Sequence, residues 1–126
     1  MEAFRGDGEA GAGLPGLHLA LGETLIHLEQ PADAEAELKE EVRLFPLDPR
    51  AYVSLASLYH SLDREDDAAQ VLEDLLEALP TPEGSSAAAR AWTAMGNKER
   101  ADAIRAEART KFKGDPSLSL LGRSRP

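Results

Sequence analysis

Cysteine is absent from this sequence of 126 residues, and aromatic side chains make up only 5% of it. Without thiols the chain can form no disulfide framework, no thiolate zinc site and no cysteine nucleophile, which is compatible with a reducing compartment. Long apolar runs are missing too, so no segment is expected to span a bilayer, and residues 1–13 do not resemble a secretory signal. We therefore expect a cytoplasmic protein without a membrane partner.

Residues branched at the β-carbon are also sparse, whereas Ala, Leu, Glu and Arg dominate the composition. These four residue types lose little free energy on entering a helix, so we expect an all-α protein. The length and the 42% of hydrophobic residues fit one domain with a buried core. The glycine-rich residues 1–13 are expected to form a flexible tail in front of that domain.

Prolines mark an internal repeat in the chain. Four of them are spaced 34, 33 and 34 residues apart, at Pro15, Pro49, Pro82 and Pro116. Asp48, Thr81 and Asp115 precede the last three of these prolines. Such a pair is typical of a helix start, because the side-chain oxygen accepts a free backbone N–H and proline has none to satisfy. We therefore expect four helices to start on this period, and turn signals halfway through each period divide the units into helix pairs.

Apolar residues recur in the same register within the units. In the second unit they occur at steps of three and four residues, as Tyr52, Leu55, Ala56 and Tyr59 and then Ala68, Val71, Leu72, Leu75 and Leu79. These steps predict one core-facing stripe on each helix. Isolated helices of this length are marginal in water, so we expect each pair to be stabilised by packing against the next pair.

The repeat resembles the tetratricopeptide repeat family, whose unit has this length and a fixed pattern of Leu-Gly, Tyr, Ala and Pro. The second unit matches at Tyr52, Leu55, Ala56, Tyr59, Ala68, Leu72 and Pro80, and the first unit at Leu21, Gly22, Leu25, Ala34, Leu38 and Pro46. The resemblance implies an α-α superhelix, or solenoid, of about three helix pairs over residues 14–122. The repeats would span about 15–48, 49–81 and 82–114, followed by a capping helix at 115–122 and a tail at 123–126.

Four positions depart from the family pattern. His18 and Ser85 stand where an aromatic residue is usual, and Glu41 stands where a small residue usually packs. Arg105 replaces a large apolar residue in the third unit. The third unit is therefore a degenerate copy of the repeat.

The resemblance also implies a concave groove, lined by the first helix of each pair, that accepts a segment of another protein. By register, the groove residues here would be Leu19, Glu23, Ile26, His27, Arg50, Val53, Ser57, His60, Ser86 and Arg90. We expect them to lie opposite the packing stripe. The implied function is that of a scaffold or adaptor that binds a peptide or helix of a partner protein.

Other chemistries find little support in the sequence. The three histidines form no recognised ligand pattern, and the carboxylates are spread along helices, so we expect no metal, no cofactor and no catalytic residue. A basic stretch from Arg90 to Lys113 lacks the aromatic residues that stack on bases, which argues against nucleic acid. We therefore expect a protein that is not an enzyme.

Charge is divided unevenly along the chain. Residues 1–89 carry 5 basic and 19 acidic side chains, whereas residues 90–126 carry 9 basic and 4 acidic ones, so the net charges are -14 and +5. Opposed charge at the two ends could promote association of one copy with another. A self-associating structural module, and an accessory domain of a larger enzyme or complex, remain alternatives to the adaptor.

Overall fold

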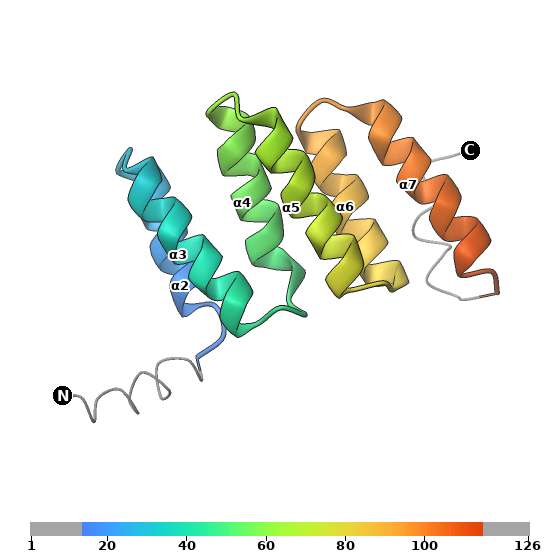
Figure 1. The fold of residues 1–126 in the computed structure, drawn as a ribbon, viewed down its shortest axis with the longest axis horizontal. Helices are drawn as coiled ribbons and strands as arrows, with labels where there is room; N and C mark the ends of the chain where they lie inside the picture. Colours follow the sequence, from blue (N-terminus) through green and yellow to red (C-terminus); the bar gives the residue numbers. More distant parts are fainter. Residues whose placement is uncertain (1–13, 115–126) are drawn as a thin grey trace.

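The structure is a computed structural model that describes residues 14–114. This part of the chain is all-helical and forms three consecutive helix pairs, which lie in a row (Figure 1). The helices are α2 (Leu17–His27), α3 (Pro31–Leu44), α4 (Pro49–Ser61), α5 (Glu65–Ala78), α6 (Pro82–Ala94) and α7 (Lys98–Lys111). The expected tails at 1–13 and 123–126 and the expected capping helix at 115–122 lie outside the described residues.

Two helix starts follow the expected pattern of a capping side chain and proline. The Asp48 carboxylate accepts the backbone N–H of Arg50 at 3.0 Å, and α4 begins at Pro49. The Thr81 hydroxyl accepts the N–H of Gly84 at 3.1 Å, and α6 begins with a proline in the same way. These side chains satisfy N–H groups that have no partner within the helix, which confirms the period between the second and third units.

The first helix departs from this period. A start at Pro15 is wrong, because α2 begins at Leu17 and follows Gly16, whose backbone lies in the left-handed region at φ 94°. Leu14 precedes this proline and has no side-chain oxygen with which to cap the helix. The N-terminus of α2 therefore needs an acceptor from elsewhere in the molecule.

The expected stripe of the second unit is buried, apart from Leu79, which is partly buried. In each pair the second helix presents an alanine with no exposed surface, at Ala34, Ala68 and Ala101. These three alanines follow the repeat period, and their small side chains allow the helices of a pair to approach closely. Close approach in every pair explains why the repeat retains alanine at this position.

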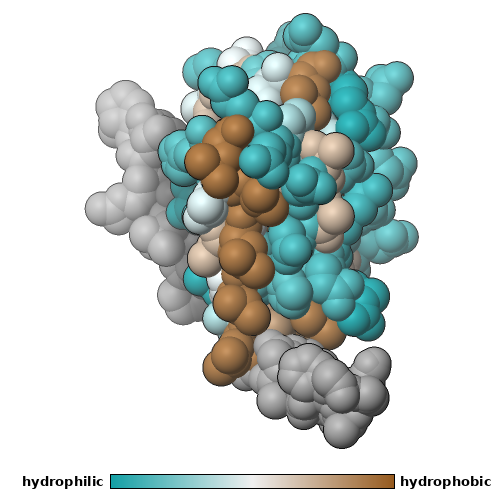
Figure 2. All heavy atoms as spheres, turned by 90° about the vertical axis from the view of Figure 1, so that its left-hand side faces the viewer, coloured by the Kyte–Doolittle hydropathy of each residue, from teal (hydrophilic) through white to brown (hydrophobic). Residues whose placement is uncertain are grey.

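The same register is wrong for one residue of α2. Leu55 is 4% exposed in α4, whereas Leu21, one period earlier, is 42% exposed. The difference arises because this side of α4 packs against α3, while no element within residues 14–114 precedes α2. Figure 2 shows the resulting band of hydrophobic residues at the end of the row.

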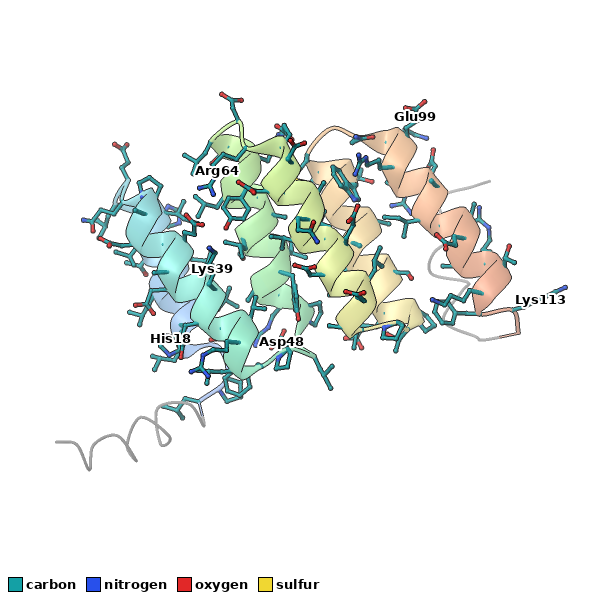
Figure 3. All side chains as sticks on the ribbon, in the orientation of Figure 1. His18, Lys39, Asp48, Arg64, Glu99 and Lys113 are labelled. Atoms are coloured by element: carbon teal, nitrogen blue, oxygen red, sulfur yellow. The ribbon has the colours of Figure 1, made fainter. Side chains whose placement is uncertain are left out.

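One carboxylate links the first helix pair to the second. Glu35 of α3 accepts a hydrogen bond from the Tyr59 hydroxyl at 2.6 Å and pairs with Arg64 at 3.2 Å and with Lys39 at 3.1 Å. Figure 3 shows Lys39 on α3 and Arg64 beside α4, where these two helices face each other. The hydrogen bond from Tyr59, followed by the two cations, lowers the pKa of Glu35 to about 2. Burial and the same hydrogen bond raise the pKa of Tyr59.

Acid should weaken this link in a defined pH range. Because the pKa of Glu35 falls from 4.5 to about 2 on folding, its contribution is present above the higher value and is lost as the pH drops through that range. We expect Tyr59→Phe to reduce the acid dependence of the free energy of unfolding, measured by urea denaturation at several pH values. Tyr52→Phe is the matched control, since the Tyr52 hydroxyl donates to the Pro46 carbonyl and not to a carboxylate. An equal change in both variants would contradict this role of Glu35.

Leucines at the centre of the stripe should dominate stability. Leu72 and Leu55 are 1% and 4% exposed, and we expect truncation of either to alanine to lower the free energy of unfolding by about 2–5 kcal/mol. Leu62→Ala, at an exposed leucine, should cost less than about 1 kcal/mol. Chemical denaturation of the three variants measures the difference. Melting of the Leu55 and Leu72 variants at the parent's temperature would contradict their burial in the core.

Candidate functional site

The first helices of the three pairs form a continuous hollowed surface. A hollow of about 300 Å³ lies between α2, α4 and α6, and its lining is Leu19, Glu23, Pro49, Arg50, Val53, Ser54, Ala87 and Arg90. A second hollow of about 290 Å³ continues it between α2 and α4, lined by Glu23, Ile26, His27, Val53, Ser54 and Ser57. The two hollows share three residues, so we describe them together as the groove.

The groove has an apolar floor and charged sides. Leu19, Val53 and Ala87 supply apolar surface from three different helices. Arg50 and Arg90 bring two cations to the same hollow. A partner that buries an apolar side chain here would therefore place its neighbouring groups next to positive charge.

Polar side chains along the middle of the groove are partly engaged with each other. The Ser54 hydroxyl donates a hydrogen bond to the Glu23 carboxylate at 3.1 Å, which joins α4 to α2. His27 lines the second hollow and is exposed. These groups leave acceptors and donors along the groove that a bound backbone could use.

Arg50 is held in place by its own helix start. Its guanidinium donates to both oxygens of Asp48, at distances from 2.6 to 3.2 Å. This hydrogen bonding lowers the pKa of the Asp48 carboxyl and raises that of Arg50. Asp48 lies at the start of α4 (Figure 3), so the residue that caps this helix also orients a groove cation.

Most of the residues expected from the sequence come together in the groove. Eight of the ten line it, and the exceptions are His60 and Ser86. His60 instead lies 2.9 Å from the carboxylate of Glu65, in the first turn of α5. Pro49, Ser54 and Ala87 also line the groove and were not among the residues expected from the sequence. Ser54 and Ala87 lie four residues after Arg50 and three residues before Arg90, so helical spacing could have identified them.

The expectation that Leu19 lies opposite the packing stripe is wrong. Leu19 is 8% exposed and belongs to the hydrophobic core, on a helix that contacts both α3 and α4. Ile26 and Val53 are half-buried and pack against the same core. The floor of the groove is thus an extension of the core and not a separate apolar patch.

A buried carboxylate supplies the acceptor that the start of α2 lacks. Glu41 of α3 is 1% exposed and accepts the backbone N–H groups of Gly16 at 2.7 Å, His18 at 3.1 Å and Leu19 at 3.2 Å. Negative charge is favourable at a helix N-terminus, where these donors have no partner within the helix. The cap fixes the start of the helix that carries Leu19 and Glu23 into the groove. The departure of Glu41 from the repeat pattern therefore has a structural cause.

Side chains that could bind metal are dispersed in the part of the chain that the structure describes. No three His, Asp or Glu side chains within residues 14–114 gather into a group that could hold a metal ion. His18 lies 2.6 Å from the carboxylate of Glu37 on α3 and does not line the groove. This contact stays within the first helix pair.

Comparisons with known protein families, with curated proteins and with solved structures find no match for this chain. The resemblance to the tetratricopeptide repeat therefore stays a prediction from the sequence. Among the described residues, no helix is both long enough and apolar enough to cross a bilayer. The geometry and charge of the groove are consequently the observations that bear on function.

Removal of the Glu41 carboxylate should destabilise α2 selectively. We expect Glu41→Ala to lower the free energy of unfolding by about 2–3 kcal/mol, because three N–H groups lose a charged acceptor. Amide hydrogen exchange at Gly16, His18 and Leu19 should accelerate more than exchange in α4. Glu40→Ala is the control, since Glu40 pairs with Arg43 on the surface and such pairs contribute little. Unchanged exchange at the start of α2 would contradict the capping role.

Proposed function

We propose that the groove formed by α2, α4 and α6 binds a segment of a partner protein, and that the chain acts as a scaffold or adaptor and not as an enzyme. The observation that carries this proposal is the continuity of the groove. Its two hollows share Glu23, Val53 and Ser54 and run past three successive first helices. An elongated, open groove of this kind suits a peptide or helix better than a compact small molecule.

The composition of the groove narrows the class of partner. Leu19 and Val53 offer apolar contact, while Arg50 and Arg90 place positive charge beside it. A segment with an apolar side chain flanked by Asp or Glu would satisfy both features. The overall net charge of -9 would oppose a strongly acidic partner at a distance, so selectivity would depend on these local contacts.

The arrangement of helix pairs is compatible with the family resemblance. We propose that the three pairs form an α-α superhelix of the tetratricopeptide type, with α2, α4 and α6 on its concave side. The small residue Ala34 and its equivalents at the repeat period support this proposal, as does the capping of α4 by Asp48. A cytoplasmic location is part of the same proposal.

A peptide-selection experiment tests the groove directly. Peptides selected from a random displayed library against the full chain should be rich in apolar residues next to Asp or Glu. We expect the double variant Ile26→Glu and Val53→Glu to bind the selected peptides at least about tenfold more weakly, because it places like charge and polar groups on the floor. Helical content below the melting transition should stay close to that of the parent, although the melting temperature should fall, because both side chains pack against the core.

Leu62→Glu provides the matched control, because this leucine is exposed at the C-terminal end of α4 and does not line the groove. It should bind the selected peptides as the parent does. Arg90→Glu should weaken the binding of peptides that contain acidic residues more than the binding of peptides that lack them. If the double variant and the parent bind equally well, the groove is not the binding surface.

A further inference from the structure

The outer side of α2 carries apolar surface that residues 14–114 leave uncovered. Six large hydrophobic side chains are exposed in this part of the chain, and four of them are Leu14, Leu17, Leu21 and Leu28, on α2 or next to its ends. Figure 2 shows a band of hydrophobic residues on this end of the row. The band lies away from the groove, because none of the four leucines lines it.

The junction between the first and second pairs shows what packs on this side of a first helix. Val42 of α3 lies with Tyr52 and Leu55 of α4 and with Val71 and Asp74 of α5 around a hollow of about 390 Å³. One period earlier, the equivalents of these α4 and α5 residues are His18, Leu21, Glu37 and Glu40. Glu77 also lines this hollow, and its equivalent is Arg43. We define the end face by these five residues together with Leu17. By register, it is the surface on which a preceding helix pair would pack.

The end face combines apolar and acidic groups. Leu17 and Leu21 are exposed. On the same side of α3, Glu37 contacts His18 and Glu40 pairs with Arg43, so the two glutamates exceed the one arginine by a single negative charge. In the second pair the position of Glu37 is occupied by the apolar Val71. The face therefore favours an occupant that is mainly apolar and carries a small net positive charge.

Residues 115–126 of this chain have both properties, whereas helices α6 and α7 do not. In the third pair the counterpart of Val42 is the charged Arg109, and no large hydrophobic side chain is exposed on α6 or α7. Beyond the described residues, the sequence 115–126 contains Leu118, Leu120 and Leu121, followed by Arg123 and Arg125. With Asp115 as its only acidic residue, this segment has a net charge of +1, from two arginines and one aspartate.

Two other occupants from the same chain place like charges together. Residues 1–13 contain three acidic side chains and one basic side chain, a net charge of -2, and would meet Glu37 and Glu40. A symmetric contact between two end faces would bring together two surfaces of the same net charge. Within one copy, α2 and α7 lie at opposite ends of the row, so a contact between these ends joins two copies (Figure 1).

We propose that the end face binds residues 115–126 of a second copy of this chain. Leu118, Leu120 and Leu121 cover Leu17 and Leu21, while Arg123 and Arg125 lie beside Glu37 and Glu40. The contact is heterologous, because the end face of one copy meets the C-terminal segment of another. Assembly is therefore open and its mean mass rises with protein concentration, unlike that of a closed dimer. This inference does not depend on the proposed function of the groove.

Complementation between two defective variants tests the proposal. One full-length variant carries Leu17→Glu and Leu21→Glu, which disable the end face. The other carries Leu118→Glu and Leu121→Glu, which disable the C-terminal segment. Light scattering coupled to size exclusion should show that the parent assembles as its concentration rises. Each variant alone should be mainly monomeric, because its association is at least about tenfold weaker than that of the parent. An equimolar mixture should form a dimer that grows no further, since only one intact pair of surfaces remains.

Controls separate this contact from association through another surface. Leu47→Glu changes an exposed leucine outside the end face and should assemble as the parent does. The groove variant Ile26→Glu with Val53→Glu should also assemble normally, so that failure of either proposal is seen separately. Higher salt should weaken assembly, because the acidic and basic groups are exposed. Circular dichroism should show equal helical content in all variants.

Three results would overturn the proposal. The first is a monomeric parent at every concentration and salt. The second is loss of assembly on changing the end face while the variant at Leu118 and Leu121 assembles normally, which would indicate a symmetric contact between end faces. The third is the absence of a dimer in the equimolar mixture, despite folded variants.

Discussion

Burial of one apolar stripe against the neighbouring helix is the interaction on which the rest of this structure depends. The helices are 11 to 14 residues long, a length at which an isolated helix is marginal in water. Ala34, Ala68 and Ala101 permit close contact within each pair, and Leu38, Leu72 and Leu75 fill the space between helices. Each first helix is thereby held in a fixed orientation, which determines which of its residues line the groove.

Polar contacts within and between pairs add direction to this apolar packing. Glu41 fixes where α2 begins, and Glu35 joins α3 to Tyr59 of α4 and to Arg64 beyond it. Both are carboxylates of the same helix, and both receive donors from other elements. Since carboxylate hydrogen bonds are directional, they select one orientation among several that apolar contact alone would allow. Glu41 consequently ties α2 to α3 within the first pair, and Glu35 ties that pair to the second, in addition to buried area.

The sequence predicted those features that depend on neighbouring residues. The starts of α4 and α6 follow from Asp48 and Thr81 with their prolines, and the stripe of the second unit follows from its spacing. The start of α2 could not be predicted in this way, because its acceptor Glu41 lies 22 to 25 residues further along the chain. Likewise, helical register identified most groove residues. It could not predict the burial of Leu19, which depends on how neighbouring helices pack around α2.

The third pair differs from the others in what holds its second helix. In α5 the buried residues are Ala68, Val71, Leu72 and Leu75, whereas α7 buries only Ala101 and Ala108. Less apolar area keeps α7 against α6 than keeps α5 against α4, so local opening costs less free energy in the third pair than in the second. Transient release of α7 would let α6 shift, and with it Ala87 and Arg90 at one end of the groove. The α6 end of the groove can therefore adapt its width to a bound segment more readily than the middle, which α4 lines.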